Sequence, residues 1–591
     1  MALAANSAPL TTARAESLAD EIKALKEQLK QIEPMKARLK QLEDQVAAQA
    51  RKAKAAATPA PTAPMAVAKP APAASAAVAK PVPAGPVAAT TAVPVVPVAA
   101  ATPSIPMAAM TVPANQGGLG GLTPVWVSLA NGLTVESYDK DFSIRFGGNI
   151  QADAGFDTQP LGTALNAEVG IWRARLLVEG KAFKYWLYKF EYDFTRSGLN
   201  GIFDAYFAVQ HPALAVLPFT TQPITLQVGN IKEPFGLQSM GQFRNDDFIA
   251  RPSSDILVPY WHVGVAASTY GDDWSAKVGV FSSSLQENSI IPQPITQAPL
   301  PLIAQYQGEP TGGVPQLDVT GRITWAPIHT QDSLFHIGAS LRYHRPNSSV
   351  GSSDSGDSSD ARVLSPGSSS YYGNELDILG GPLVGVPGMD LSCGPVPYPQ
   401  GQFVPRCTSS VLTFGTELSA IYGPFSFQGE YIGSKYTRNA DTIAYVQSIT
   451  SPFDISTQAI ANELGGSSLY YDGWYVYGTW FLTGESRASA YNNGDLNGAN
   501  FGATDINYPV NEGGWGAWEL LARYSEINLN SGGIQAGRQD DLTIGLNWYP
   551  LRGFRLMWNW TDVVHLTGNF YRPYLDGKNP NIFLMRAQVS W

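Results

Sequence analysis

The sequence predicts an all-β fold, a 16-stranded antiparallel transmembrane β-barrel, preceded by an N-terminal α-helical coiled coil and a Pro/Ala-rich linker. Three observations predict the barrel. Apolar and polar side chains alternate with the period of a strand in sixteen segments after about residue 133. Charged residues make up only 15% of the chain while Gly, Tyr, Trp and Phe are plentiful, which is typical of strands whose outer faces contact lipid. Short connections alternate with long ones, as at the two rims of outer-membrane barrels.

Charge and cysteine content exclude some classes of partner and site. The net charge of −10 argues against nucleic acid as a partner, because no basic field would attract phosphates. Cys393 and Cys407 lie in a Gly/Pro/Ser-rich stretch with no histidine or further cysteine nearby to complete a metal-ligand set. A disulfide that closes a loop in an oxidising compartment is therefore favoured, and it would contribute about 3 kcal/mol to ordering that loop.

The N-terminal end shows no full signal peptide. Residues 1–15 lack a basic start and a long apolar region, although Ala2-Leu3-Ala4 resembles the end of a cleavage site. We interpret them as a signal-peptide remnant or a disordered segment. The apolar stretch 91–110 contains four prolines that would break a helix, so no helical membrane span is expected.

Residues 16–50 have the heptad spacing of a coiled coil. Apolar residues follow a 4-3-4-3 spacing at Leu18, Ile22, Leu25, Leu29 and Ile32. The spacing resumes out of phase after Pro34, which predicts a stammer. A single amphipathic surface helix is the alternative. We favour self-association in the periplasm, with cell-wall contact through residues 16–50 as a further expectation, because the segment that follows separates this helix from the barrel.

Residues 51–120 are rich in Ala, Pro, Val and Thr and almost without charge. Frequent prolines favour an extended tether, which at roughly 3.1 Å per residue could reach on the order of 200 Å. A spacer across the periplasm, a passage to the cell wall and a plain disordered linker all fit this composition.

The barrel domain is expected over residues 133–591. Aromatic side chains occupy every second position of 186–194, and the last strand carries an outward apolar row that ends in Trp591. The sixteen expected strands are 142–153, 169–179, 186–194, 203–210, 224–229, 262–270, 274–281, 317–325, 335–344, 412–422, 425–431, 474–482, 518–525, 542–549, 554–561 and 581–591.

One connection departs from the rim asymmetry. Residues 483–514 lie on the rim that otherwise has tight turns, yet they form a long segment. Either this segment folds back into the lumen or the strand count slips there.

Several motifs together carry a family resemblance. They are Gly-Asn-Ile-Lys-Glu-Pro-Phe-Gly-Leu at 229–237 and the segments 473–478, 481–487, 516–525, 546–550 and 586–589. On these motifs the chain resembles the phosphate-selective porin O and P family over roughly 133–591. The resemblance implies a homotrimer in the bacterial outer membrane, in contact with its lipid and lipopolysaccharide. It also implies that the third external loop, 231–261, enters the lumen, with 346–410 and 483–514 as further candidates.

The strand alternation directs ten basic side chains into the lumen. These pore-lining candidates are Arg145, Arg173, Arg175, Lys189, Lys277, Arg322, Arg342, Arg523, Arg555 and Arg586. Guanidinium groups suit anions, because each offers paired donors and a permanent positive charge. Nine acidic side chains face inward too, so cross-strand pairing that stiffens the wall is the competing interpretation. Preference for phosphate is implied by the family resemblance alone.

Loop 231–261 supplies the candidates for a constriction. They are Lys232, Arg244, Asp246, Asp247 and Arg251. Opposed charges at a constriction would create a transverse field that orients a solute. Alternatively, these groups bond one another and hold the fold of the loop.

The sequence favours a channel over an enzyme. Its six histidines are scattered, and their spacing indicates neither a catalytic triad nor a metal site. The leading hypothesis is a passive outer-membrane porin for small anions or small polar solutes that needs no cofactor. The alternative is a structural anchor that links the membrane to the cell wall through the coiled coil and the tether.

Overall fold

The computed structural model describes residues 109–110, 125–129, 132–157, 167–196, 198–214, 220, 222–282, 317–345, 408–438, 468–532, 534–567 and 576–591. All of them lie in the second of the two units into which the chain divides, residues 101–591. The expected N-terminal remnant, coiled coil and most of the linker lie outside the described residues, as do Cys393 and Cys407.

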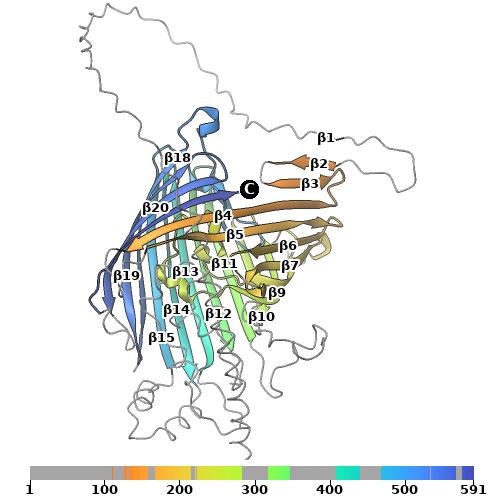
Figure 1. The fold of residues 1–591 in the computed structure, drawn as a ribbon. Coiled ribbons are helices and arrows are strands. Elements are labelled where there is room, and N and C mark those ends of the chain that lie inside the picture. Colours follow the sequence, from red (N-terminus) through yellow and green to blue (C-terminus); the bar gives the residue numbers. More distant parts are fainter. Residues whose placement is uncertain are drawn as a thin grey trace, which may run out of the picture. The chain divides into compact units, whose positions relative to one another are not determined.

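Sixteen antiparallel strands form one closed barrel (Figure 1), which confirms the barrel part of the predicted fold class. In chain order they are β4 (Ser143–Asp157), β5 (Ala167–Ala182), β6 (Trp186–Asp193), β7 (Ile202–Gln210), β8 (Thr225–Lys232), β9 (Trp261–Tyr270), β10 (Trp274–Phe281), β11 (Leu317–His329), β12 (Ser333–Arg345), β13 (Thr408–Tyr422), β14 (Phe425–Arg438), β15 (Ser468–Phe481), β18 (Ala517–Ser531), β19 (Ile534–Tyr549), β20 (Phe554–Thr567) and β21 (Asn581–Ser590).

The barrel closes between its last strand and its first. β21 pairs with β4 from Ile582↔Asp157 to Ser590↔Asn149. Trp591 then exchanges backbone hydrogen bonds with Gly148, at 3.1 and 3.0 Å. Because every strand has two neighbours, the closed sheet leaves no long unpaired edge.

Short strands before β4 extend the sheet from the part of β4 that β21 does not reach. β3 (Leu133–Ser137) pairs with the first residues of β4, and β2 (Val125–Ser128) pairs with β3 and with β1 (Ala109–Met110). We did not expect β1 to β3 as strands, because they are too short for an alternation to be recognised.

The two faces of the barrel differ as the alternation predicts. On β6 the outward Trp186 and Phe190 are 46% and 44% exposed, whereas the inward Lys189 is buried. An apolar outer face is suited to contact with lipid, and a polar inner face is suited to a water-filled lumen. None of the helices in the described ranges is long and apolar enough to cross a membrane.

The height of the barrel wall is uneven. Strands β6 to β10 have only 8 to 10 residues each. By contrast, β11 to β15 and β18 to β20 have 13 to 16 residues each. One side of the barrel is therefore lower than the other; β6 to β10 are called the low wall here, and β11 to β15 with β18 to β20 the tall wall.

Two long connections contain short elements of their own. The first, residues 233–260, joins β8 to β9 and is called the constriction loop here; it contains α2 (Leu237–Met240), η3 (Phe243–Asn245) and η4 (Ser253–Leu257). The second, residues 482–516, joins β15 to β18 and is called the lower connection; it contains η7 (Arg487–Ala490), β16 (Tyr491–Asn492), β17 (Asn500–Phe501) and η8 (Val510–Glu512).

Apolar side chains of the constriction loop pack against inward-facing side chains near one end of the tall strands. Ile256 and Leu257 of η4 belong to one buried cluster with Ile432, Tyr471 and Ile527 of β14, β15 and β18. The inward face is thus apolar at that height, and the constriction loop is held by burial as well as by hydrogen bonds.

Candidate functional site: the constriction inside the barrel

The constriction loop starts on one wall of the lumen. The backbone N–H groups of Leu237 and Gln238, at the start of α2, donate to the carboxylate of Glu430 on β14, at 3.1 and 2.6 Å. Glu430 is buried and also accepts a hydrogen bond from the Tyr475 hydroxyl, at 2.6 Å. A buried carboxylate that receives two backbone N–H groups fixes this end of the loop.

The loop also contacts the neighbouring part of the wall at β18 and β20, where two predicted pore-lining arginines hold it. Arg523 Nη2 donates to the carbonyl oxygen of Ala250 at 2.9 Å, and Arg555 Nη1 donates to that of Asp246 at 2.6 Å. Arg555 Nη2 also donates to the carbonyl oxygen of Arg244, at 3.0 Å. These guanidinium groups therefore bind the constriction loop itself.

Charges within the loop pair with one another. Arg251 Nε lies 2.9 Å from Asp246 Oδ2, and Arg251 Nη1 lies 3.7 Å from Asp255 Oδ1. Burial alone would lower the pKa of the Arg251 guanidinium, but the two aspartates outweigh burial and hold that pKa above its usual range. For Asp246 and Arg251 the geometry fits the interpretation that these groups hold the fold of the loop.

Phe243 in η3 is surrounded by cations. Arg251 and Arg173 place their guanidinium carbons 4.0 and 4.4 Å from the centre of its ring. Arg175 lies at 5.1 Å and the Lys232 ammonium at 5.6 Å. Cation–π attraction to one ring gathers four basic groups that would otherwise repel one another. Sequence reasoning missed Phe243, because nothing distinguishes one aromatic residue in a loop from another.

Asp247 joins the constriction loop to the lower connection. Its Oδ2 accepts a hydrogen bond from the Tyr477 hydroxyl at 2.8 Å and lies 2.8 Å from Arg487 Nη2. Burial would lower the pKa of Arg487, but Asp247 and Tyr477 outweigh it and raise that pKa above its usual range. Arg487 is a functional candidate that the strand alternation could not identify, because it lies outside the strands.

The lower connection folds back into the lumen. Lys277 Nζ donates to the carbonyl oxygen of Leu496 at 2.7 Å, and Arg322 Nη1 donates to that of Ala499 at 2.9 Å. Both basic residues face inward from β10 and β11. Of the two interpretations of the long connection, the structure therefore has the inward fold, and the strand count does not slip.

The remaining predicted pore-lining residues lie on the inner wall. Arg145, Arg175, Lys189 and Arg586 form ion pairs with Glu179, Asp193, Asp204 and Asp153, respectively. Arg173 Nη1 donates to Gln151 Oε1 at 2.8 Å, and Arg342 Nη2 lies 3.0 Å from Asp318 Oδ2 on β11. Cross-strand pairing therefore neutralises much of the lining charge.

A narrow cavity remains between the low wall and the constriction loop. Its volume of about 20 Å³ accommodates about one water molecule. Its charged lining residues are Arg175, Lys189, Lys232, Arg244, Glu191 and Asp204. Basic side chains therefore outnumber acidic ones in the lining by four to two. Burial lowers the pKa of the Arg244 guanidinium.

Comparison with known families decides the class of protein. The family model "Phosphate-selective porin O and P" matches residues 144–371 and 402–591. The chain belongs to the phosphate-selective porin O and P family. It is an outer-membrane porin, and its family is one of channels, not of enzymes.

One curated relative and two solved structures are similar to this chain. The chain is 25% identical to Porin O of Pseudomonas aeruginosa over 458 residues, which cover 72% of this chain and 83% of that porin. Two solved structures are more distantly similar. OmpT of Vibrio cholerae is 9% identical with a TM-score of 0.40, covering 76% of this chain and 98% of OmpT. OmpF of Salmonella typhi, in complex with daunomycin, is 7% identical with a TM-score of 0.39, covering 77% of this chain and 100% of OmpF.

Proposed function

We propose that this porin lets small anions diffuse passively through the barrel, along the wall formed by β4 to β9. The observation that carries the proposal is the cavity beside the constriction loop, where four basic side chains face two acidic ones. An anion that passes this point meets an excess of positive charge in a confined space, where screening by water is weak. Family membership is consistent with this preference.

Ion selectivity in a planar bilayer tests the proposal. Arg244 is the best residue to change, because its side chain lines the cavity, whereas the hydrogen bonds that Arg555 and Gln588 make to it go to its backbone carbonyl oxygen. A substitution of the side chain therefore leaves these two attachments of the loop in place. One unit charge about 4 Å from the permeating ion is worth about 1 kcal/mol at the dielectric constant of water, or about a fivefold change. We expect Arg244→Gln to lower the chloride-to-potassium permeability ratio by about that factor.

A matched control is Arg552→Gln. Arg552 lies in the turn between β19 and β20, and its side chain is 61% exposed. Its loss should leave the reversal potential unchanged. If wild-type protein shows no anion preference, or if both variants shift the potential equally, the proposal is wrong. Phosphate added at millimolar levels should reduce the chloride current; without that reduction the channel is a general porin.

We further propose a homotrimer whose subunits meet at the low wall. A strand of eight residues, tilted by about 40°, spans about 20 Å, which is less than the roughly 25 Å apolar band of a barrel. A neighbouring copy would cover this shortfall. The outer face of β9 to β12 also contains an apolar groove of about 560 Å³, hollowed by the small residues Ala267, Ala276, Gly321 and Ala339.

Spin labels test this interface in a chain whose Cys393 and Cys407 are serines. Val278, which is 53% exposed, lies on the low wall, and Val476, which is 37% exposed, faces outward on the tall wall. A nitroxide attached to Val278→Cys should be shielded from oxygen dissolved in lipid, and one attached to Val476→Cys should be accessible. Equal accessibility would refute the proposed interface.

A further inference from the structure

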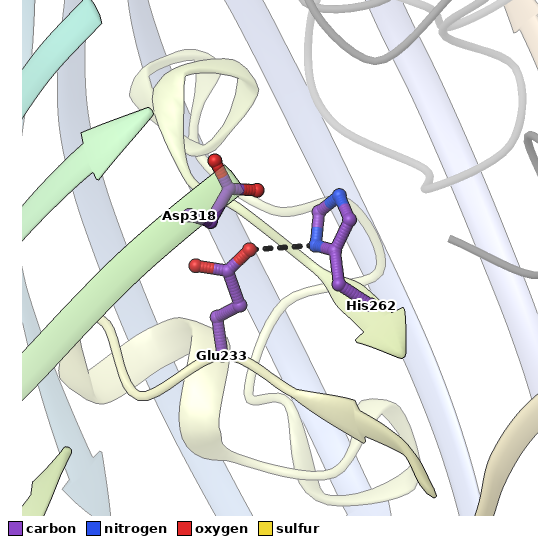
Figure 2. Close-up of side chains that lie close together, drawn as sticks. All are labelled: Glu233, His262 and Asp318. Carbon is purple, nitrogen blue, oxygen red and sulfur yellow. Dashed lines mark ion pairs between the residues drawn. The ribbon is translucent and has the colours of Figure 1, made fainter. Parts of the chain in front are cut away.

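Three buried side chains from separate parts of the chain converge at the base of the constriction loop. Glu233 begins the loop, His262 is the second residue of β9, and Asp318 is the second residue of β11 (Figure 2). His262 Nδ1 lies 2.7 Å from Glu233 Oε1, and one ligand atom of each residue lies within 4.8 Å of those of the other two. We propose that these residues bind a divalent transition-metal ion such as Zn²⁺.

The donor set suits such an ion. An imidazole nitrogen with two carboxylate oxygens is a common ligand combination for Zn²⁺, and a fourth position can hold water. Atoms that bind zinc at about 2.0–2.2 Å in a tetrahedron lie about 3.3 Å apart. Glu233 and His262 would therefore separate by a few tenths of an ångström, a movement that side-chain torsions can supply.

Neighbouring groups hold the carboxylates in place. Arg342 Nη2 lies 3.0 Å from Asp318 Oδ2, and the Thr320 hydroxyl donates to Glu233 Oε2. His344 Nδ1 is hydrogen-bonded to Asp318 Oδ1. Outer groups that orient the ligand side chains in this way are typical of metal sites.

Burial makes a bound cation favourable here. Glu233, Asp318 and His262 are 0%, 0% and 4% exposed. Two carboxylates in such a place require compensating positive charge, and Arg342 supplies one unit of it. The remaining unit can come from a metal ion or from a proton on His262 or on His344, which is hydrogen-bonded to Asp318, and the measurements below separate metal binding from protonation.

The location gives the site a mechanical consequence. Glu233 is the first residue of the constriction loop, and His262 follows shortly after its end. The backbone N–H of Glu233 donates to the carbonyl oxygen of Tyr260, the last residue of the loop, at 2.9 Å. An ion shared by the two side chains and by Asp318 would join both ends of the loop to the barrel wall.

Zinc binding by the purified full-length chain in detergent tests the site. After treatment with a chelator, Zn²⁺ is titrated in competition with a chromophoric chelator, with folding monitored by heat-dependent gel mobility. We expect one zinc per chain, with X-ray absorption showing one imidazole among oxygen ligands. His344→Ala should weaken binding about 10- to 100-fold as an outer group, and His262→Ala should weaken it further.

The matched control is His565→Ala, because His565 on β20 is 53% exposed and lies far along the chain from the cluster. The His565→Ala variant should bind zinc with the same affinity as the wild-type protein. If wild-type protein binds no zinc stoichiometrically, or if the bound ion has no imidazole ligand, the proposal is overturned. The same holds if folded His262→Ala and His262→Gln bind zinc as tightly as wild type. Wild-type spectroscopy decides the question even if both variants fail to fold.

Discussion

Arg251 and Asp246 form an ion pair that lies entirely within the constriction loop, with Nε 2.9 Å from Oδ2 and only 1% of the Arg251 side chain exposed. The same guanidinium lies against the ring of Phe243. The loop therefore has a charged core of its own, in addition to its attachments to the barrel.

Removal of Arg251 should disrupt this core. Arg251→Met leaves Asp246 and Asp255 as buried carboxylates without their cation, and breaking a buried pair typically costs about 3–5 kcal/mol. We expect a lower temperature for the loss of the compact gel form and larger current noise in single-channel records. Arg538→Gln is the control, because its pairs with Glu526 and Asp540 involve a side chain that is 40% exposed. An equal loss in both variants would contradict the special role of Arg251.

Arg555 should control the position of the loop with less effect on the barrel. Its guanidinium donates to the carbonyl oxygens of Asp246 and Arg244, so Arg555→Met releases two attachments at once. We expect an increase in single-channel conductance, because the loop is freed from the β20 wall. Arg586→Met is a useful comparison, because Arg586 pairs with Asp153 on the wall and not with the loop. Unchanged conductance in Arg555→Met would show that the loop does not limit the current.

Tyr491 should stabilise the inward fold of the lower connection. Its hydroxyl lies 2.8 Å from His336 Nδ1, and its ring packs against Phe501. Tyr491→Phe removes the hydrogen bond and keeps the ring, so a loss of about 1 kcal/mol is expected. Thermal unfolding in detergent measures this effect. Phe501→Leu tests the ring contact separately, and a loss confined to Phe501→Leu would show that the hydroxyl contributes nothing.

Gly229 should tolerate no side chain. Its φ is +139°, and a Cβ there would lie 2.3 Å from the carbonyl oxygen of Ala205 on the neighbouring strand. Gly229→Ala should therefore disturb the pairing of β7 with β8, directly before the constriction loop, and lower the yield of folded barrel. At Gly170 on β5 no heavy atom lies within 4 Å of the added carbon. Gly170→Ala should fold normally; equal yields for the two variants would contradict the steric argument.

The strands were predictable from the sequence because lipid and lumen impose opposite chemistry on alternate residues. Several strands are longer at one end than the sequence predicts. β14 continues to Arg438 where 431 was expected, and β18 continues to Ser531 where 525 was expected. At that height inward residues such as Ile432 and Ile527 are apolar, because they pack against the constriction loop, so the alternation stops before the strand does.

The role of each lining residue was less predictable. Alternation directs Arg523 and Arg555 inward, but it does not indicate whether they meet solvent or a loop. Arg555 and Asp246 are 309 residues apart, and their contact depends on the path of a segment without periodicity. For the same reason the cluster of Glu233, His262 and Asp318 could not be recognised, since only Glu233 belongs to a local motif, the one at 229–237, and the other two residues lie outside it along the chain.

The attachment of the constriction loop to late strands affects the order of assembly. Arg555 and Gln588, which both donate to Arg244, belong to β20 and β21, and β21 is also the strand that closes the barrel on β4. Arg244 is synthesised 311 residues before Arg555, so this part of the loop remains unattached to β20 and β21 until these C-terminal strands arrive. Closure of the cylinder and locking of its interior are thus one late kinetic event, and such long-range pairing is slow. An intermediate that lacks the last two strands would be an open sheet with a mobile loop, and this is the species that chaperones would need to protect.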